Sequence, residues 1–304
     1  MNIEPVLNFF LGLLLAPLVF GVIHRVKAFF AGRCGQPLLQ PYHDLLKMMR
    51  KGAVYSRTTS WVFRAGPILG TAAATAGLAL MPLGGVPALI SFPGDVLLFA
   101  YLLGLMRFVT MVAALDTGSA FEGMGASREA WFSMLAEPAL LIGLAALSVH
   151  TGSISLSGML DGLRLTELGG AGGPLMLLVA FVLMIVLLTE NARIPVDDPA
   201  THLELTMIHE VMVLDHGGVD FGLIQYGAAL KFWVLAALLT GVLVPAPVGM
   251  LPLDVAVRMG FILGVAAVVG IIEAVMARLK LVRVPQLLVA ASVLSVLSLA
   301  LVLR

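Results

Sequence analysis

Residues 173–189 read GPLMLLVAFVLMIVLLT and contain no charged side chain. A helix needs about 20 consecutive apolar residues to cross the hydrocarbon core of a bilayer. The polar segment ENARIPVDDP follows directly at residues 190–199. An apolar run of this length, bounded by charged residues, predicts a membrane-spanning helix with a polar loop after it.

Four further runs, 5–23, 67–90, 95–115 and 286–303, are almost as free of charge. The whole chain is 60% hydrophobic and 12% charged, whereas soluble domains are about 25% charged. The sequence therefore predicts an all-α integral membrane protein with one polytopic domain over residues 1–304. We predict eight transmembrane helices, at 5–26, 66–87, 95–115, 130–150, 173–191, 227–246, 255–277 and 285–303.

The charge and cysteine content exclude several classes of protein. The formal net charge is zero, so the chain has no basic field for nucleic acid. Its single cysteine, Cys34, excludes a disulfide framework and an iron–sulfur cluster held by this chain alone. No glycine-rich phosphate loop or dinucleotide fingerprint is present. Glu4 at the start of the first apolar run argues against a cleavable signal peptide.

The distribution of lysine and arginine predicts the orientation, because cytoplasmic loops of membrane proteins carry an excess of both. With the first connection in the cytoplasm, basic residues on that side greatly outnumber Arg164, Arg258 and Arg304 outside. Both termini are then predicted on the outer side of a bacterial or archaeal inner membrane. The first connection alone holds Arg25, Lys27, Arg33, Lys47, Arg50, Lys51, Arg57 and Arg64.

Two cytoplasmic segments look helical but are too short or too polar to span. One is 41–51, where leucine and methionine alternate with charged residues at helical spacing. The other is 198–215, which opens with Asp198 as a helix cap and Pro199 at the first helical position. We expect both helices to lie at the membrane interface or to fold back into the bundle.

Ionisable groups within predicted spans are costly and need a reason. Glu137 lies in the middle of a span and is followed by Pro138, which removes a backbone donor and is expected to open the helix locally. Such a carboxyl suits a proton relay; the alternative is a neutral glutamate bonded to a neighbouring helix. Arg107 and Glu273 are the other candidates: Arg107 either pairs structurally with a carboxylate or has a functional role, and Glu273 is expected near the interface.

The densest group of acids runs from Glu190 through Asp197 and Glu204 to Glu210. Crowded carboxylates at reduced dielectric raise one another's pKa, so some of them can exchange protons near neutrality. A solvated loop is the simpler alternative. The spacing of Asp198 and His202 also permits a metal ligand pair, but the sequence forces no further ligand nearby.

The same segment carries a family resemblance. The pattern E-x-x-R-x-P-x-D, here Glu190, Arg193, Pro195 and Asp197, resembles the cytoplasmic loop of the quinone-cradle membrane subunit of respiratory complex I. It resembles more closely the related subunit of membrane-bound group 4 nickel–iron hydrogenases of the formate hydrogenlyase or hydrogenase-4 type. The stretches LQPYHDL at 39–45 and LDTGSAFEGMGASREA at 115–130 are similar to loops of the same family.

The chain departs from the complex I pattern at Ala200 and His202, which stand where acids are usual, and at 212–214, which read Met-Val-Leu. Glu204 does match. Because this region lines the quinone chamber in complex I, the departures favour a hydrogenase-like complex. A quinone-site subunit of an NADH dehydrogenase and a stand-alone secondary ion transporter remain the alternatives.

The resemblance implies a membrane-anchor and coupling subunit that binds no cofactor itself. Nickel–iron and iron–sulfur centres are expected in hydrogenase-like large and small subunits and iron–sulfur subunits docked on the cytoplasmic face, with antiporter-like membrane subunits alongside. The predicted proton-transfer residues are Glu137, Glu190, Asp197, Glu204, Glu210 and Glu273. The predicted loop-organising or docking residues are Arg193, Asp116, Glu122, Arg128 and Asp44.

Overall fold

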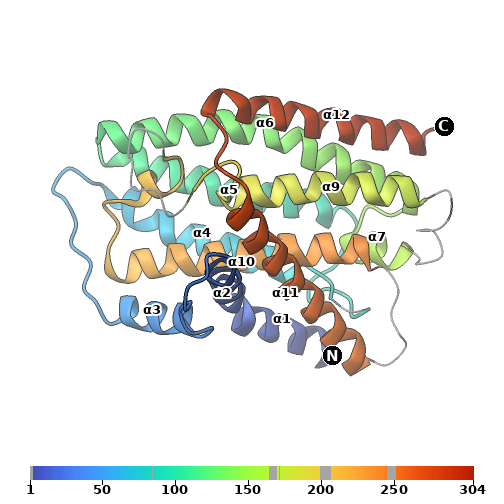
Figure 1. The fold of residues 1–304 in the computed structure, drawn as a ribbon, viewed down its shortest axis with the longest axis horizontal. Helices are drawn as coiled ribbons and strands as arrows, with labels where there is room; N and C mark the ends of the chain where they lie inside the picture. The colour runs from blue at the N-terminus through green and yellow to red at the C-terminus, as the bar shows by residue number, and fades with distance from the viewer. Residues whose placement is uncertain (1–2, 84, 164–169, 171, 199–206, 245–250) are drawn as a thin grey trace.

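The computed structural model describes residues 3–83, 85–163, 170, 172–198, 207–244 and 251–304. These residues form helices and no strand (Figure 1). The long helices are α1 (Ile3–Leu15), α2 (Leu18–Phe30), α3 (Gln40–Met49), α4 (Trp61–Ala79), α5 (Asp95–Asp116), α6 (Ala120–Thr151), α9 (Gly173–Glu190), α10 (Gly218–Leu243), α11 (Leu251–Val275) and α12 (Val284–Val302). The short ones are α7 (Leu156–Gly162) and the 3₁₀ turns η1 (Glu210–Val213) and η2 (Leu281–Arg283).

Among the described helices, six are long and apolar enough to cross a membrane, or seven when α1 and α2 count as one bent span. The remaining predicted span corresponds to α4, which packs against α5 and α10. Its sequence is rich in alanine, glycine and threonine, so it is less apolar than the others. The chain is a multi-pass membrane protein, in agreement with the predicted all-α bundle.

The first predicted span, 5–26, is not one straight helix. The chain breaks between Leu15 and Leu18, and α1 and α2 meet at an angle of 44°. Pro17 lies at this break, where its ring removes the backbone donor that would continue the helix. The bend points α2 across the bundle, so that it packs along α11.

The long helices lie roughly along one direction, whereas α11 crosses them obliquely (Figure 1). α12 packs against α6 and α9 at one edge of the molecule, and α1 and α3 lie near the opposite edge. α10 is the most buried of the six spans, and it carries the fully buried Phe232 and Trp233. α1 begins and α12 ends toward the same end of the bundle, as an even number of spans requires.

Helix boundaries differ from the sequence predictions where polar residues continue a helix beyond the apolar run. α6 begins at Ala120 and not near 130, and α10 begins at Gly218 and not near 227. The predicted short helix over 41–51 is confirmed as α3. Over 198–215 the prediction of a continuous helix is wrong for the described part, since residues 207–215 contain only the turn η1.

Candidate functional site

A cavity of about 720 Å³ extends from the ends of α2 and α9 along the first half of α10, as far as Lys231. Its wall combines apolar side chains such as Phe20 and Met106 with an unusual number of charged ones. The charged lining residues are Lys27, Arg33, Asp44, Glu190, Arg193, Asp197, Glu210, Lys231 and Glu273. A space of this size and polarity can hold several water molecules or a small organic ligand.

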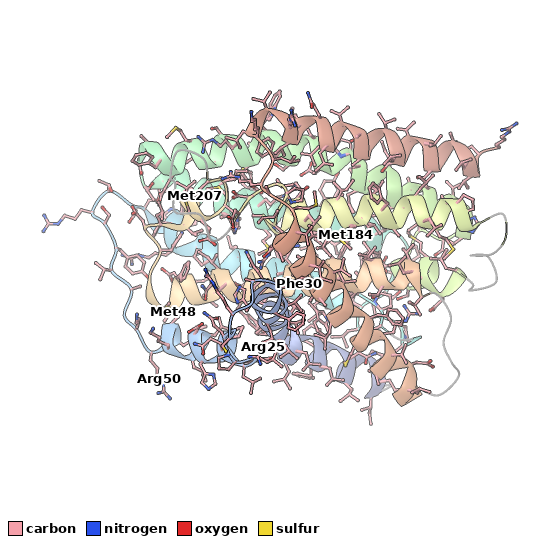
Figure 2. The ribbon with its side chains drawn as sticks, in the orientation of Figure 1. Arg25, Phe30, Met48, Arg50, Met184 and Met207 are labelled. Atoms are coloured by element: carbon pink, nitrogen blue, oxygen red, sulfur yellow. The ribbon has the colours of Figure 1, made fainter. Side chains whose placement is uncertain are left out.

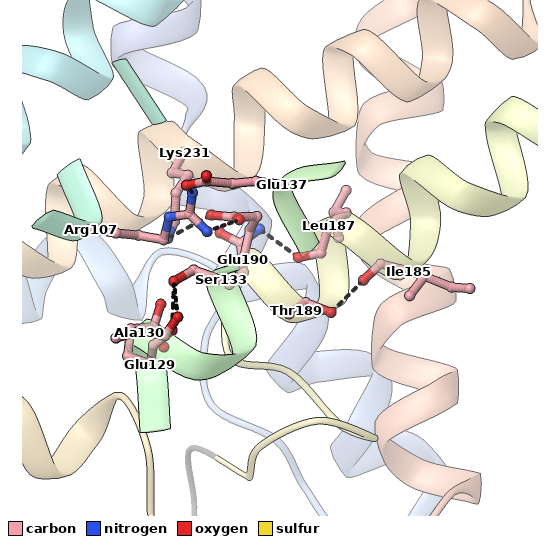
Figure 3. A network of polar contacts seen from close by, with 11 residues as sticks. Arg107, Glu129, Ala130, Ser133, Glu137, Ile185, Leu187, Thr189, Glu190 and Lys231 are labelled. Carbon is pink, nitrogen blue, oxygen red and sulfur yellow. Dashed lines mark hydrogen bonds and ion pairs between the residues drawn. The ribbon is translucent and has the colours of Figure 1, made fainter. Parts of the chain in front are cut away.

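Beside the cavity, Arg107 of α5 forms the centre of a buried ionic network (Figure 3). Its side chain is 6% exposed, and its Nη1 donates to Glu190 Oε1 over 2.8 Å. Its Nη2 donates to Glu137 Oε1 on α6. Lys231 of α10 lies near the other oxygen of this carboxylate, with its Nζ 3.8 Å from Glu190 Oε2. A single guanidinium thus links carboxylates from two different helices, a geometry that its planar fork allows.

The two carboxylates of this network face different surroundings. Glu190 is the last residue of α9, its side chain is 2% exposed, and it lines the cavity together with Lys231. The side chain of Glu137 is 50% exposed, on the outer surface of α6. Gly104 of α5 lies beside it, and a Cβ there would be in ordinary contact with Glu137 Oε1, at 3.7 Å. The network therefore leads from the cavity to the lateral surface of the chain.

A second ionic cluster holds Glu273, which the sequence placed near the interface. Its side chain is 1% exposed and lies between Lys27 Nζ at 3.3 Å and Arg193 Nη1 at 3.2 Å. The Arg193 guanidinium also lies over the Phe20 ring, 4.7 Å from its centroid. This cluster ties α2, α11 and the loop after α9 together at the wall of the cavity.

Asp197 organises the loop after α9. Its Oδ2 accepts the backbone N–H groups of Ile208 and His209, at 3.0 and 3.2 Å, and its Oδ1 lies 3.0 Å from Arg278 Nη2. Burial raises the pKa of Asp197, against the opposing influence of Arg278 and the amides. Burial and the nearby Lys231 and Arg193 charges lower the pKa of His209 to about 3, so this imidazole is neutral at physiological pH.

The predicted loop-organising residues bond within the chain. Asp116 accepts the Ser60 N–H at 2.6 Å and hydroxyl at 2.8 Å, which fixes the start of α4. Glu122 accepts the Asp215 N–H at 3.1 Å, and Arg128 donates to the Met207 carbonyl at 2.8 Å. Each of these last two bonds fastens the loop of residues 207–215 to α6.

Asp44, the remaining predicted loop-organising residue, accepts a hydrogen bond from Gln40 one helical turn earlier, at 3.0 Å. It also lines the cavity. Its position therefore connects α3 with the cavity wall, although its bond to Gln40 lies within one helix.

The structure brings together most of the predicted proton-transfer residues. Glu190, Asp197, Glu210 and Glu273 line the cavity, and Glu137 joins it through Arg107. One expectation for Glu137 was wrong: α6 continues through Pro138 without a break. The Glu137 carboxyl pairs with Arg107 of the neighbouring helix α5, in keeping with the structural pairing that the sequence left open for Arg107. Glu204 lies outside the described residues. Within the described part of the chain, no three His, Cys, Asp or Glu side chains are placed to hold a metal ion.

Several functional candidates were missed from the sequence. Lys27 and Arg278 were counted only as loop charges, yet both form ion pairs with predicted acids. Glu129 of α6 lies beside the Arg107 network and lines a small pocket together with Arg107 and Glu190. Lys231 was counted as lying near a membrane surface, but it is 3% exposed in the interior of α10. A lysine within an apolar run was the available signal.

Comparison with known proteins places this arrangement in a family. The chain matches the NADH dehydrogenase family over residues 4–303. It is 30% identical to formate hydrogenlyase subunit 4 of Escherichia coli K12 over 90% of this chain and 89% of that protein. It is also 30% identical to hydrogenase-4 component C of the same organism, over 77% of this chain and 72% of that protein.

Two further similarities extend over more distant proteins. A subunit of the NADH-quinone oxidoreductase of Anaplasma phagocytophilum is 27% identical over 66% of this chain and 62% of that protein. A chain of the membrane-bound sulfane sulfur reductase, an archaeal respiratory membrane complex, shares the fold with a TM-score of 0.84. That likeness covers 99% of this chain and 98% of the other at 20% identity. The bundle, the charged cavity and the family match over nearly the full length together lead to one conclusion: this chain belongs to the NADH dehydrogenase family.

Proposed function

We propose that this chain is the membrane-anchor and coupling subunit of an energy-converting, hydrogenase-like redox complex. In this role it links electron transfer in a docked cytoplasmic arm to the translocation of protons or sodium ions. Its similarity over most of their lengths to formate hydrogenlyase subunit 4 and hydrogenase-4 component C supports a subunit of this kind. The nickel–iron and iron–sulfur centres would belong to the soluble partner subunits.

The observation that carries the proposal is the connection between the cavity and the lateral surface. Glu190 lines the cavity, contacts Arg107 over 2.8 Å, and Arg107 in turn contacts the half-exposed Glu137. A guanidinium stays charged in proteins, so it cannot itself pass a proton on. It can hold either carboxylate in its ionised form. When Glu190 takes up a proton, it loses its negative charge and its electrostatic attraction to Arg107 weakens. The attraction between Arg107 and Glu137 is then the stronger of the two.

The charges of the network favour the retention of a proton. Three acids, Glu129, Glu137 and Glu190, interact with two cations, Arg107 and Lys231. One negative charge is left over when all three acids ionise, and an uncompensated charge in a low-dielectric interior is costly. One shared proton removes this excess. In the proposed cycle, the acids lining the cavity, Asp197 and Glu210 among them, supply that proton.

The position of Glu137 supports a lateral partner. Glu137 lies near the middle of α6, a helix of 32 residues and about 48 Å, so its carboxylate is at the depth of the hydrocarbon core. A half-exposed carboxylate at that depth is not stable against lipid. We propose that an antiporter-like membrane subunit covers this surface and continues the path, while hydrogenase-like and iron–sulfur subunits dock at the cytoplasmic end.

One observation favours a second candidate function, a quinone site as in an NADH dehydrogenase. The cavity volume of about 720 Å³ lies within the range of small-molecule sites, and Phe20 and Met106 give it an apolar side. A stand-alone secondary ion transporter is the candidate from another class. It would share the buried carboxylates but would need no soluble partner.

Purification through a tag on this chain, in a mild detergent, tests the proposal. A hydrogenase-like complex should yield stoichiometric soluble subunits that contain nickel and iron, and it should reduce protons or oxidise hydrogen. Soluble subunits without nickel, together with reduction of an added quinone, would instead support the quinone-site function. Recovery of the chain alone, with ion transport after reconstitution, would contradict both and identify a transporter.

A further inference from the structure

α3 lies against the start of α10 and leaves a long face uncovered. None of its residues is fully buried. Its inner side contacts α10, where a Cβ on Gly222 would lie 3.2 Å from Met48 Cβ. Toward its other end, Tyr42 Oη donates to the Leu14 carbonyl over 2.6 Å, at the bend between α1 and α2. α3 is thus fixed at two points, and its depth in the membrane follows from both.

Leu14 is near the end of the 13-residue α1, which is about 20 Å long and therefore crosses more than half of a core of about 30 Å. Gly222 lies in the second turn of the 26-residue α10, a helix of about 39 Å whose ends project beyond the core. α1 begins and α10 begins at opposite ends of the bundle (Figure 1). α3 accordingly starts within the membrane and reaches the interface in its last turn.

The uncovered face matches this gradient of depth. At 100° per residue, Leu39, Leu46, Lys47 and Arg50 share one side of α3, opposite Met48. The two leucines are 55% and 58% exposed in chain order. Lys47 and Arg50, both exposed, lie in the last turn or directly after it, and the exposed Lys51 follows. Apolar side chains therefore lie along the helix and three bases gather at its interfacial end.

Within residues 25–64, all of which the structure describes, no exposed acid balances these bases. Asp44 is the sole acid of that segment; it is half-buried and bonded to Gln40. Figure 2 shows Arg50 at the outer edge of the molecule, with Met48 further inside. Basic side chains beside apolar ones at an interface attract the phosphate groups of anionic lipids, while the apolar ones meet acyl chains.

We propose that the outer face of α3, formed by Leu39, Leu46, Lys47, Arg50 and Lys51, binds an anionic phospholipid of the cytoplasmic leaflet. The phosphate lies against the three bases and an acyl chain runs along the leucines. A soluble subunit would meet the bases but could not cover Leu39 and Leu46 at membrane depth. The site is independent of the proposed coupling function, because it requires only that the chain spans a membrane with α3 on its cytoplasmic side.

The test compares spin-labelled phosphatidylglycerol with spin-labelled phosphatidylcholine around the whole purified complex in nanodiscs. We expect the wild-type complex to retain phosphatidylglycerol preferentially and to lose the preference in high salt, which screens exposed charges. The double substitution Lys47→Gln/Arg50→Gln should lower the selectivity at least about fivefold, since one basic residue at an anionic surface contributes about that factor. Arg57→Gln/Arg304→Gln is the matched control, because it removes two exposed bases away from α3.

Loss of selectivity in the α3 variant, with the control unchanged, supports the site. Equal selectivity in all three proteins, or equal loss in both variants, would overturn it. Dissociation of soluble subunits from the α3 variant with lipid selectivity intact would overturn it as well, by showing that α3 serves a protein. If the α3 variant fails to assemble, the comparison of the two lipids around the wild-type complex still tests the proposal. A wild-type complex without a salt-sensitive preference for phosphatidylglycerol would contradict it.

Discussion

Arg107 Nη1 lies 2.8 Å from Glu190 Oε1, an ion pair between α5 and the last residue of α9 with both side chains buried. The other terminal nitrogen of Arg107 contacts Glu137 on α6. One guanidinium therefore connects the wall of the charged cavity with a carboxylate on the lateral surface. This connection is the structural basis of the proposed coupling role.

Arg107→Gln should destabilise the assembled complex, because it leaves the buried Glu190 without its closest cation. Removal of one partner from a buried ion pair costs about 3–5 kcal/mol, and Glu137, being half exposed, adds little. Arg107→Lys should be intermediate, since an ammonium group cannot bridge both carboxylates with the same geometry. Thermal unfolding of the purified complex measures the order. Indistinguishable melting temperatures for wild type and Arg107→Gln would contradict it.

Arg193→Ala should reduce assembly or activity more than Arg304→Ala does. Arg193 holds Glu273 at 3.2 Å and stacks on Phe20, so its loss opens one wall of the cavity. Arg304 is the exposed last residue of the chain. Co-purified soluble subunits and redox activity should be compared in membranes with equal amounts of each variant. Equal tolerance of both substitutions would refute a role for Arg193 in holding the loop.

Gly125→Ala should release the loop that carries His209 and Glu210 from α6. A Cβ at this position would collide with Val211 and lie only 3.0 Å from the Ile208 carbonyl oxygen. Gly123, two residues earlier on the same helix, has open space and supplies the control. There alanine should be neutral or stabilising by about 0.5–1 kcal/mol. Limited proteolysis of residues 207–215 measures the release, and equal cleavage in both variants would argue against tight packing at Gly125.

The orientation of the chain stays a prediction that reporter fusions can check. Fourteen basic residues on the predicted cytoplasmic side, against three on the outer side, predict that both termini lie outside. In agreement with an even number of spans, α1 begins and α12 ends toward the same end of the bundle. Fusions at either terminus should give periplasmic signals. A cytoplasmic signal from either one would reverse the predicted orientation or change the number of spans.

Apolar runs predicted the helices well because lipid requires long, uncharged segments, and the span predicted at 173–191 became α9 almost unchanged. They failed at helix ends. Asp220 and Gln225 look like loop residues, but α10 already contains them, because polar residues continue a helix once it leaves the membrane core. Because α10 begins earlier than predicted, Lys231 lies about 20 Å from the start of its helix. There it pairs with Glu190 and does not face solvent.

The acids of the site were recognisable from their crowding, but their partners were not. Glu190 and Arg107 are separated by 83 residues, and Arg193 and Glu273 by 80. Nothing local in the sequence fixes which helices meet. The exposure of Glu137 was equally hidden, because hydropathy gives the depth of a residue but not the side of the helix that faces a neighbour. Tertiary packing alone decides both.

The proposed proton path is tested most directly by Glu137→Gln, which keeps the shape and hydrogen-bonding capacity of the side chain but cannot ionise. Arg107 then keeps Glu190 as its counter-charge, so the complex should assemble. The control substitution is Glu4→Gln, at an exposed residue. Glu273→Gln would not serve as a control, because Glu273 lies in the cavity wall. The measurement is the number of ions pumped per electron by the reconstituted complex. We predict that redox turnover persists while this ratio falls in Glu137→Gln and stays at the wild-type value in Glu4→Gln; a wild-type ratio in assembled Glu137→Gln would contradict the relay.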